Sequence, residues 1–220
     1  ILEEDIALAN IALDLLGQTQ MWLGLAAEVE GGRRSADDLA MLRDTWGFRN
    51  VILVERPNED FGQTMMRQFL FDAYHIELLE QLVASSDKRI SAISAKALKE
   101  VKYHVERSAG TVIALGDGSE ESHNRLQAAL DDQWTFAGEL FETDTGDRVL
   151  YDAGITPLPS SLRAGFDARV KAVLDEATLT IPDTVFAHSG GRSGKRHSEH
   201  LGHLLTQMQW LQRAYPGATW

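Results

Sequence analysis

The stretch FDAYHIELLEQL, residues 71–82, decides the fold that we predict for this chain. It places Asp72 and His75 three residues apart, so that both side chains lie on one face of a helix. Phe69 and Ile76 share that side, which indicates that the helix is buried. A carboxylate and a histidine at this spacing on a bundle helix are typical of half of a di-iron site. The stretch therefore predicts a four-helix bundle that carries a metal site or the remains of one.

Composition limits the class of protein and its partners. A chain of 220 residues with 44% hydrophobic content can bury a full core, and we predict a single domain. The net charge of −12 repels a phosphate backbone or an anionic membrane, so neither nucleic acid nor a membrane is an expected partner. The chain has no cysteine, which excludes disulfides, thiolate metal sites and cysteine nucleophiles and fits a cytoplasmic protein.

Apolar residues recur at helical spacing along most of the chain, and no alternating pattern typical of a strand is evident. We predict helices over about residues 2–28, 59–84, 88–115, 120–141, 161–178 and 198–214, with a shorter one that begins at the cap Ser35. Residues 51–54 fit either a helix end or a brief extended piece. The polar stretch before Pro157 and the glycine-containing segment before the last helix are expected to be loops.

The first predicted helix has an unusual composition. Between Ile6 and Ala27 its only ionisable residue is Asp14, so we expect it to be buried on more than one side. A membrane span is the alternative, but polar residues such as Asn10 and Gln18 interrupt the apolar run too often. The better interpretation is a central bundle helix, which could also contact a partner subunit.

The predicted helices nearly supply a di-iron ligand set. Such a bundle needs one acidic residue from each of two helices and an acid-x-x-His pair from each of the other two, all pointing inward. The candidates, in chain order, are Asp14, Asp72 with His75, Glu100 with His104, and Asp131. The fourth helix lacks its histidine, because Trp134 stands three residues after Asp131 and an indole N–H cannot ligate a metal. We therefore predict a relict site without metal, in which side-chain pairs stand at the ligand positions. Lys99, Lys102, Arg67, Arg107 or the two histidines could compensate the buried acids.

Long motifs extend this interpretation. The stretches EEDIALANIALDLLGQ, FRNVILVERPNEDFGQTMMRQFLFDAYH, ISAKALKEVKYHVERS and SEHLGHLLTQMQWLQRAYPGATW resemble the C-subunit family of the bacterial phenylacetyl-CoA epoxidases, also called phenylacetate-CoA oxygenases. The resemblance covers essentially the whole chain. It implies one ferritin-like domain over residues 1–220, with additional C-terminal helices and without a short segment that precedes Ile1 in the family.

The resemblance also implies a function. In this family the A subunit holds the di-iron centre that epoxidises the ring of phenylacetyl-CoA with electrons from a reductase, and the C subunit is its structural partner. We therefore expect a non-catalytic member of this monooxygenase complex, active in phenylacetate catabolism and aromatic compound degradation. It would hold no cofactor of its own and would form homo- and hetero-oligomers with the A subunit and the other epoxidase subunits.

The segment before the last helix offers two further candidate sites. His197, His200 and His203 have a spacing that could bind a metal, although no neighbouring helix is expected to supply more ligands. The locally basic sequence SGGRSGKR carries Arg192, Lys195 and Arg196. These cations could contact an acidic partner surface or the phosphates of coenzyme A on a neighbouring subunit, or belong to a solvated loop.

The end of the chain and the rival functions leave alternatives open. Met208, Trp210, Leu211 and Tyr215 have the composition of an interface core, but they could equally fold back on the bundle. No glycine-flanked serine or phosphate-binding loop supports other catalytic classes. The rivals to a scaffold are an active di-iron oxygenase or ferroxidase that uses the six acids and histidines above, and a self-contained helical binding module.

Overall fold

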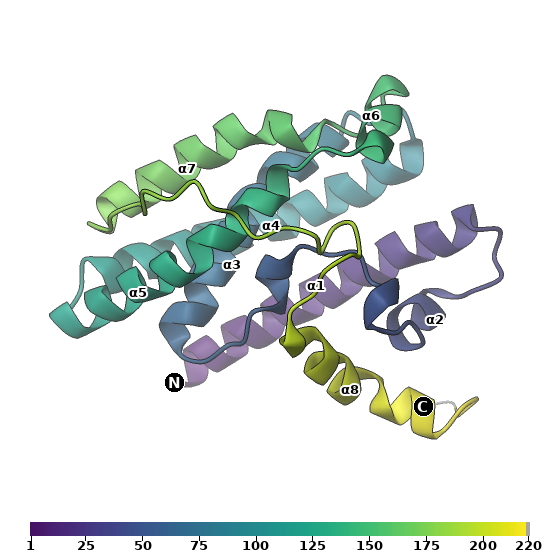
Figure 1. Ribbon diagram of the computed structural model, residues 1–220, viewed down its shortest axis with the longest axis horizontal. Helices are drawn as coiled ribbons and strands as arrows, with labels where there is room; N and C mark the ends of the chain where they lie inside the picture. Colours follow the sequence, from purple (N-terminus) through teal and green to yellow (C-terminus); the bar gives the residue numbers. More distant parts are fainter. Residues whose placement is uncertain (219–220) are drawn as a thin grey trace. The chain divides into compact units, whose positions relative to one another are not determined.

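The computed structural model describes residues 1–218, and its regular structure over those residues is helical throughout, without a strand (Figure 1). The all-α prediction is confirmed. The chain forms two compact units: unit 1 comprises residues 1–48 and 199–218, and unit 2 comprises residues 49–198. The single ferritin-like domain over residues 1–220 stays a prediction. None of the described helices combines the length and the apolar character that crossing a membrane requires.

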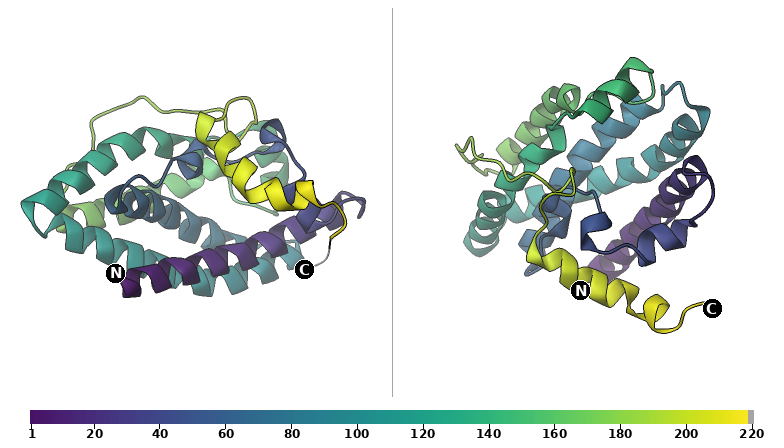
Figure 2. Two further views of the ribbon diagram at one scale, coloured as in Figure 1. Left: turned by 90° about the horizontal axis from the view of Figure 1, so that it is seen from below. Right: turned by 45° about the vertical axis from the view of Figure 1, so that its right-hand side comes forward.

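Unit 2 is built on four helices, α3 (Phe61–Leu82), α4 (Lys88–Gly116), α5 (Glu120–Ala137) and α7 (Arg163–Glu176). They lie side by side in both views of Figure 2, and α3 packs against each of the other three. Their shared core is apolar, with fully buried side chains such as Phe69, Leu126, Leu130 and Phe166. Three of them, α3, α4 and α5, are predicted bundle elements, whereas the fourth is α7 and not the helix over residues 2–28, which belongs to unit 1.

Local signals explain where these helices begin. Asp60 caps α3 by accepting a hydrogen bond from the backbone N–H of Gln63, and Asp87 caps α4 in the same way through Arg89. Ser119 starts α5 with a capping box. Each cap satisfies N–H groups that the first turn of a helix leaves without a partner. The predicted starts of these three helices, at about residues 59, 88 and 120, agree with the observed ones to within a few residues.

Shorter elements connect them. Residues 52–54 of the ambiguous segment 51–54 lie in the 3₁₀ helix η2 (Ile52–Glu55), and Val51 before them is extended. The helix α5 continues as the 3₁₀ helix η3 (Gly138–Phe141). Another 3₁₀ helix, η4 (Pro159–Leu162), precedes α7. The helix α6 (Thr145–Asp152) lies in the stretch predicted to be a loop, and that prediction was wrong. Its eight residues are too few to show a repeating apolar pattern in the sequence, and none of them is buried.

Unit 1 contains α1 (Leu2–Val29), α2 (Ala36–Met41), the 3₁₀ helix η1 (Thr45–Gly47) and α8 (Glu199–Ala214). Ser35 begins α2 with a capping box, as predicted. The amide of Gln209 on α8 donates to the carbonyls of Ala40 and Arg43, which ties α8 to the end of α2.

Two expectations about unit 1, the burial of α1 and the packing of the end of α8, are compared with the exposed fractions of their side chains. Only Ile11, Gln18 and Ala27 of α1 are buried, and Leu13 is 65% exposed, so the expectation of a helix buried on several sides was wrong. Trp210 at the end of α8 is 60% exposed. Met208, Leu211 and Tyr215 are also exposed, so these side chains do not fold back onto the core. Residues 219 and 220, which end the last resembling motif, lie outside the described residues.

Candidate functional site

The predicted acid-x-x-His pair lies on the inner face of α3. The Asp72 side chain is 0% exposed and His75, one turn later, is largely buried. Across from them, α4 contributes His104 and Ser108, which are both fully buried. The apolar residues around Asp72 pack into the core, which explains why the helix turns this face inward despite its polar members. The structure thus brings together the polar residues of two predicted bundle helices.

Protein groups occupy both oxygens of the Asp72 carboxyl group. The amide of Gln68 donates to one oxygen over 2.6 Å, and the hydroxyl of Ser108 donates to the other over 2.8 Å. Burial raises the pKa of Asp72 from 3.8 to about 7, and these two hydrogen bonds oppose the increase. Gln68 and Ser108 therefore provide the polar contacts that a buried carboxyl group needs if it is to be satisfied without a cation.

His75 lies in an environment that keeps its imidazole neutral. Burial, and to a smaller extent the charge of His104, lower the pKa of His75 to about 4. Its ring centroid lies 5.3 Å from that of Phe71, and the buried Nδ1 atom has no hydrogen-bond partner among residues 1–218. At neutral pH this side chain is an uncharged, packed group.

Asp131 does not take part in this cluster. It is exposed on α5 and accepts a hydrogen bond from Gln127, so its predicted placement on the inner face was wrong. Gln133 faces inward instead, with 1% of its surface exposed, and its amide donates to Gln63 on α3 over 2.7 Å. Trp134 is partly buried against the core at the side of the helix. The inner face of α5 is therefore rotated away from the predicted ligand positions.

Glu100 and Asp14 are the remaining candidate ligands. Glu100 is half-buried on α4, one turn before His104. Asp14 is half-buried on α1 and belongs to unit 1, so its membership of the cluster stays a prediction. Residues 1–218 contain no group of three or more histidine, aspartate or glutamate side chains arranged to hold a metal ion. The donors that are assembled, with Asp72 already hydrogen-bonded, do not fit a di-iron centre, which needs four carboxylates and two imidazoles.

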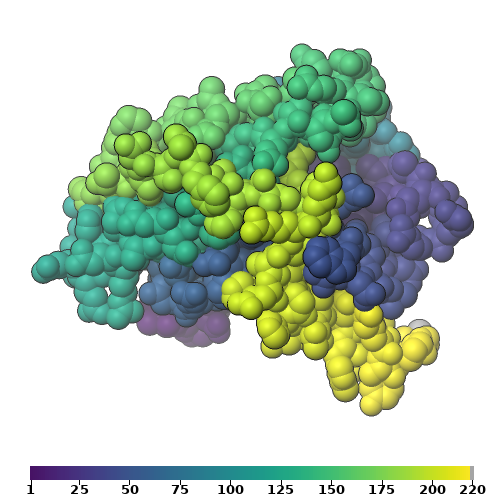
Figure 3. Space-filling model, in the orientation of Figure 1, coloured from purple at the N-terminus to yellow at the C-terminus, as the bar shows by residue number. Residues whose placement is uncertain are grey.

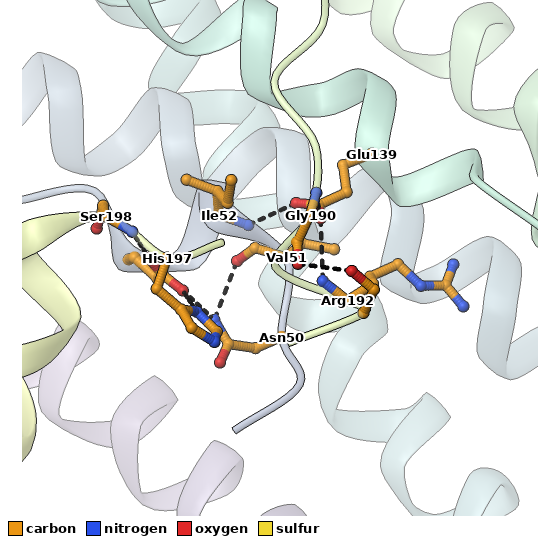
Figure 4. A network of polar contacts seen from close by, with 10 residues as sticks. Asn50, Val51, Ile52, Glu139, Gly190, Arg192, His197 and Ser198 are labelled. Carbon is orange, nitrogen blue, oxygen red and sulfur yellow. Dashed lines mark hydrogen bonds and ion pairs between the residues drawn. The ribbon is translucent and has the colours of Figure 1, made fainter. Parts of the chain in front are cut away.

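A second polar network was not anticipated from the sequence, and Figure 4 shows part of it. It fixes residues 180–198, which we call the strap. Glu139 of η3 is 0% exposed and accepts three backbone hydrogen bonds, from the N–H groups of Ile52 (2.7 Å), Gly190 (2.9 Å) and Arg192 (3.0 Å). One buried carboxylate thus joins η2 and η3 to the strap.

Glu55 of η2 holds the end of the strap in the same manner. Its oxygens contact Nδ1 of His197 and the N–H of Ser198, each over 2.6 Å, and accept a bond from the side chain of Asn50. The side chains of Glu55 and His197 are each 1% exposed. The strap is therefore an anchored segment, and His197 is a structural partner of Glu55.

The cations of the basic sequence differ in their surroundings. The guanidinium group of Arg192 pairs with Asp147 over 3.0 Å and donates to the carbonyls of Leu140 and Glu142, so it is used within the chain. The predicted contact of Arg192 with a partner or with coenzyme A phosphate stays a prediction beside this internal role. The side chains of Lys195 and Arg196 are exposed.

Gly191 allows the strap to approach η2. A Cβ atom at this position would overlap the backbone oxygen of Asn50, and Gly190 has a φ of +116°, which favours glycine. We expect Gly191→Ala to lower the free energy of unfolding of unit 2 by about 2–4 kcal/mol, because the strap must move away from two buried glutamates. Urea denaturation followed by circular dichroism measures this change.

Gly110 provides the matched control for that substitution. It lies within α4, where an added Cβ would meet no atom within 4 Å. Gly110→Ala should raise stability by about 0.5–1 kcal/mol through helix propensity. Equal effects of the two substitutions would contradict the close approach at Gly191.

Comparison with known proteins identifies the family of this chain. A family model described as phenylacetic acid catabolic protein matches residues 1–220. The chain belongs to this family. A relative from Escherichia coli (strain K12), named as the C subunit of 1,2-phenylacetyl-CoA epoxidase, is 45% identical over 219 residues, covering 100% of this chain and 88% of the relative. The family resemblance inferred from the long motifs is therefore confirmed.

Proposed function

We propose that this chain is a structural, non-catalytic subunit of a multicomponent oxygenase that epoxidises phenylacetyl-CoA. In this proposal it supports a catalytic A subunit, which holds the di-iron centre and receives electrons from a reductase. The chain itself binds no metal. The complex acts in aerobic phenylacetate degradation in the cytoplasm and contains several copies of its subunits.

The observation that carries the proposal is the state of Asp72. In a working bundle the carboxylate of the acid-x-x-His pair would be available to a cation. Here Gln68 and Ser108 donate to its two oxygens, and burial raises its pKa to about 7. Gln133 stands on the inner face of α5, where a second ligand pair would be needed. Hydrogen bonds thus stabilise the interior that metal ions stabilise in a di-iron protein.

The name of the E. coli relative supports membership of a complex, since that protein is described as one of the subunits of an epoxidase. The alternative is that this chain is an active di-iron oxygenase or ferroxidase. In favour of that alternative, His75 and His104 lie close enough for the charge of one to lower the pKa of the other. A carboxyl group and two imidazoles are nevertheless fewer donors than two irons require.

Iron analysis separates these two functions. The full chain is loaded anaerobically with ferrous iron, desalted and analysed, alone and after mixing with the A subunit. We expect no retained iron in the chain alone, and epoxidation of phenylacetyl-CoA only when the A subunit and a reductase are both present. About two irons per chain, as a complete carboxylate-bridged site would hold, would establish the alternative.

Binding to the A subunit is tested separately from metal content. Co-purification of the two chains, with epoxidation that depends on both, is the expected result. A chain that remains alone in the presence of the A subunit, and whose removal leaves epoxidation unchanged, would overturn the scaffold role.

A further inference from the structure

One side of α1 is exposed although it carries large apolar side chains, and the left view of Figure 2 shows this helix lengthwise. The four largest side chains on that side, with exposed fractions of 69%, 51%, 65% and 53%, are Leu2, Ile6, Leu13 and Leu16. Exposed Ala9 and Gln20 complete a row with alternating steps of four and three residues, which we call the seam. The buried Ile11 and Gln18 lie on the opposite side of the helix, so the seam is a second face of α1.

The exposed surface around the seam carries no charge. From Ile6 to Gln20 every exposed residue of α1 is uncharged, and Asp14, the one ionisable residue in this range, is half-buried. Charged residues make up 25% of the chain, so an uncharged surface over about four turns is unusual for a helix face that only meets water. A face that another protein covers avoids the cost of burying charge in this way.

The spacing of the seam indicates what kind of surface covers it. Steps of four and three residues average 3.5, the repeat by which one helix packs along another. From Leu2 to Gln20 the seam is about 27 Å long, enough for several layers of side chains. A membrane surface fits less well, because α1 has Glu3, Glu4 and Asp5 in its first turn and contains no lysine or arginine. The occupant that fits is a helix of another protein chain.

We propose that the seam packs against the seam of a second copy of this chain, with the two α1 helices antiparallel about a twofold axis near Ile11. The seam is complementary to itself in this arrangement, because its residue numbers add to 22 in pairs, 2 with 20, 6 with 16 and 9 with 13. Ala9 therefore faces Leu13 of the second copy, and a small side chain meets a large one in both central layers. Such a contact uses the same surface on both copies, as a closed dimer requires.

Charge favours the antiparallel orientation. The acids of the first turn, centred on Glu4, are then about 21 Å apart along the axis of the helix pair, which is more than two Debye lengths in physiological salt. A parallel pair would place six carboxylates side by side at one end. Because the contact itself is uncharged, two chains with a net charge of −12 meet there without burying like charges.

The mass of the full chain alone, measured by sedimentation over a range of concentrations, tests the contact. We expect a dimer with a Kd below about 10 μM. Leu13→Glu and Leu16→Glu should each raise this Kd at least about a hundredfold, because each dimer would bury two unpaired carboxylates. Both leucines are more than half exposed, so the variants should keep the circular dichroism spectrum of the parent chain.

Val149→Glu is the matched control. Val149 is 68% exposed, close to the 65% of Leu13, and belongs to α6, which lies at the surface at the upper right of Figure 3. It is not part of the seam, so this substitution introduces the same carboxylate and should leave the Kd of the dimer unchanged. A loss of dimer as large as that caused by Leu13→Glu would show that added negative charge, and not the seam, controls association.

Mixing two variants tests the register. Ala9→Lys should weaken the dimer when it is present in both copies, because two ammonium groups would be buried against leucine. A mixture of Ala9→Lys with Leu13→Glu should form a mixed dimer, at least about tenfold tighter than the dimer of either variant alone, because the introduced ammonium and carboxylate groups face each other. Absence of this rescue would contradict the pairing of residues 9 and 13.

Crosslinking tests the orientation, since the parent chain has no cysteine. In the antiparallel pair the two copies of position 12 are about 3 Å apart along the axis, whereas those of position 19 are about 24 Å apart. A short bismaleimide should therefore join two copies of Ala12→Cys and should not join two copies of Thr19→Cys. Equal crosslinking at both positions would establish a parallel pair and overturn the proposed arrangement.

This inference goes beyond the scaffold proposal, because it names the contact between copies, and it does not require that proposal. A chain that remains monomeric at about 100 μM, or a dimer that survives both Leu13→Glu and Leu16→Glu, would overturn it. A monomeric chain whose co-purification with the A subunit is abolished by Leu13→Glu would assign the seam to the A subunit instead. A monomeric chain that still co-purifies with the A subunit contradicts only the pairing of seams, so the two failures are distinguishable.

Discussion

Replacing Glu139 by alanine is expected to lower the free energy of unfolding of unit 2 by about 3–5 kcal/mol. The substitution leaves the N–H groups of Ile52, Gly190 and Arg192 without their shared acceptor, a side chain that is 0% exposed in the native chain. Each unsatisfied buried donor costs about 1–3 kcal/mol, and partial entry of water reduces the sum. Urea denaturation gives the overall change.

Hydrogen exchange shows whether Glu139 acts through these three donors. In Glu139→Ala the amides of Ile52, Gly190 and Arg192 should lose protection together, whereas amides within α3 and α4 should keep most of theirs. Glu139→Gln should have an intermediate effect, because one oxygen remains to accept while the new NH₂ group faces a donor. The control Glu142→Ala removes an exposed carboxylate and should change stability by less than about 0.5 kcal/mol. Protection that survives in all three amides would contradict the proposed role of Glu139.

Asp72 and His75 should give stability two opposite dependences on pH. The folded chain keeps a proton on Asp72 up to about pH 7, whereas the unfolded chain releases it near 3.8, so Asp72 makes stability fall as pH rises between these values. The folded chain does not protonate His75 until about pH 4, whereas the unfolded chain does so near 6.5. His75 therefore makes stability fall as pH drops through that window.

Each single substitution should reveal the contribution of the other residue. In the parent chain the two dependences largely cancel between about pH 4 and 6.5. Asp72→Asn should leave only the pH dependence of His75, so that the free energy of unfolding falls by about 3 kcal/mol on acidification from about pH 6.5 to 4. This variant should be more stable than the parent above about pH 7. His75→Leu should leave only the pH dependence of Asp72, so that the free energy of unfolding falls by about 4 kcal/mol as pH rises from about 4 to 7. Urea denaturation at a series of pH values measures both slopes.

Asp131→Asn is the control for these pH profiles. Asp131 is an exposed carboxyl group on α5, so its substitution should leave the profile of the parent chain unchanged. Slopes of the same sign in Asp72→Asn and His75→Leu would show that burial does not shift the two pKa values in opposite directions.

The sequence by itself determined the helices that bury an apolar face. In α3 the apolar residues, the cap Asp60 and the spacing of Asp72 and His75 all lie within a few turns of one helix, so local periodicity was sufficient to place both side chains. The capping boxes at Ser35 and Ser119 are equally local. The long motifs also determined the family, because matches of that length carry information from the whole chain.

Which polar residues face inward on α5 was decided by tertiary packing. Adjacent residues of a helix point about 100° apart, so Asp131 and Gln133, two residues apart, point to different sides of α5. The stretch LDDQW gives little apolar contrast to fix the rotation of the helix, and only the packing against α3, including the bond from Gln133 to Gln63, settles it. The sequence could identify the helix as part of the bundle but could not determine its inner face.

The strap depended on the tertiary structure to a greater extent. Glu55 and Glu139 stand in apolar surroundings, in ILVERP and AGELF, which was the available signal that these carboxylates are buried. Their partners lie in a glycine-containing segment that has no periodic pattern and is distant in the chain, so pairing cannot be inferred from spacing. The sequence determined the helices because their hydrogen bonds are local, whereas the tertiary structure decided the path of the strap because its hydrogen bonds join segments that meet only in the folded chain.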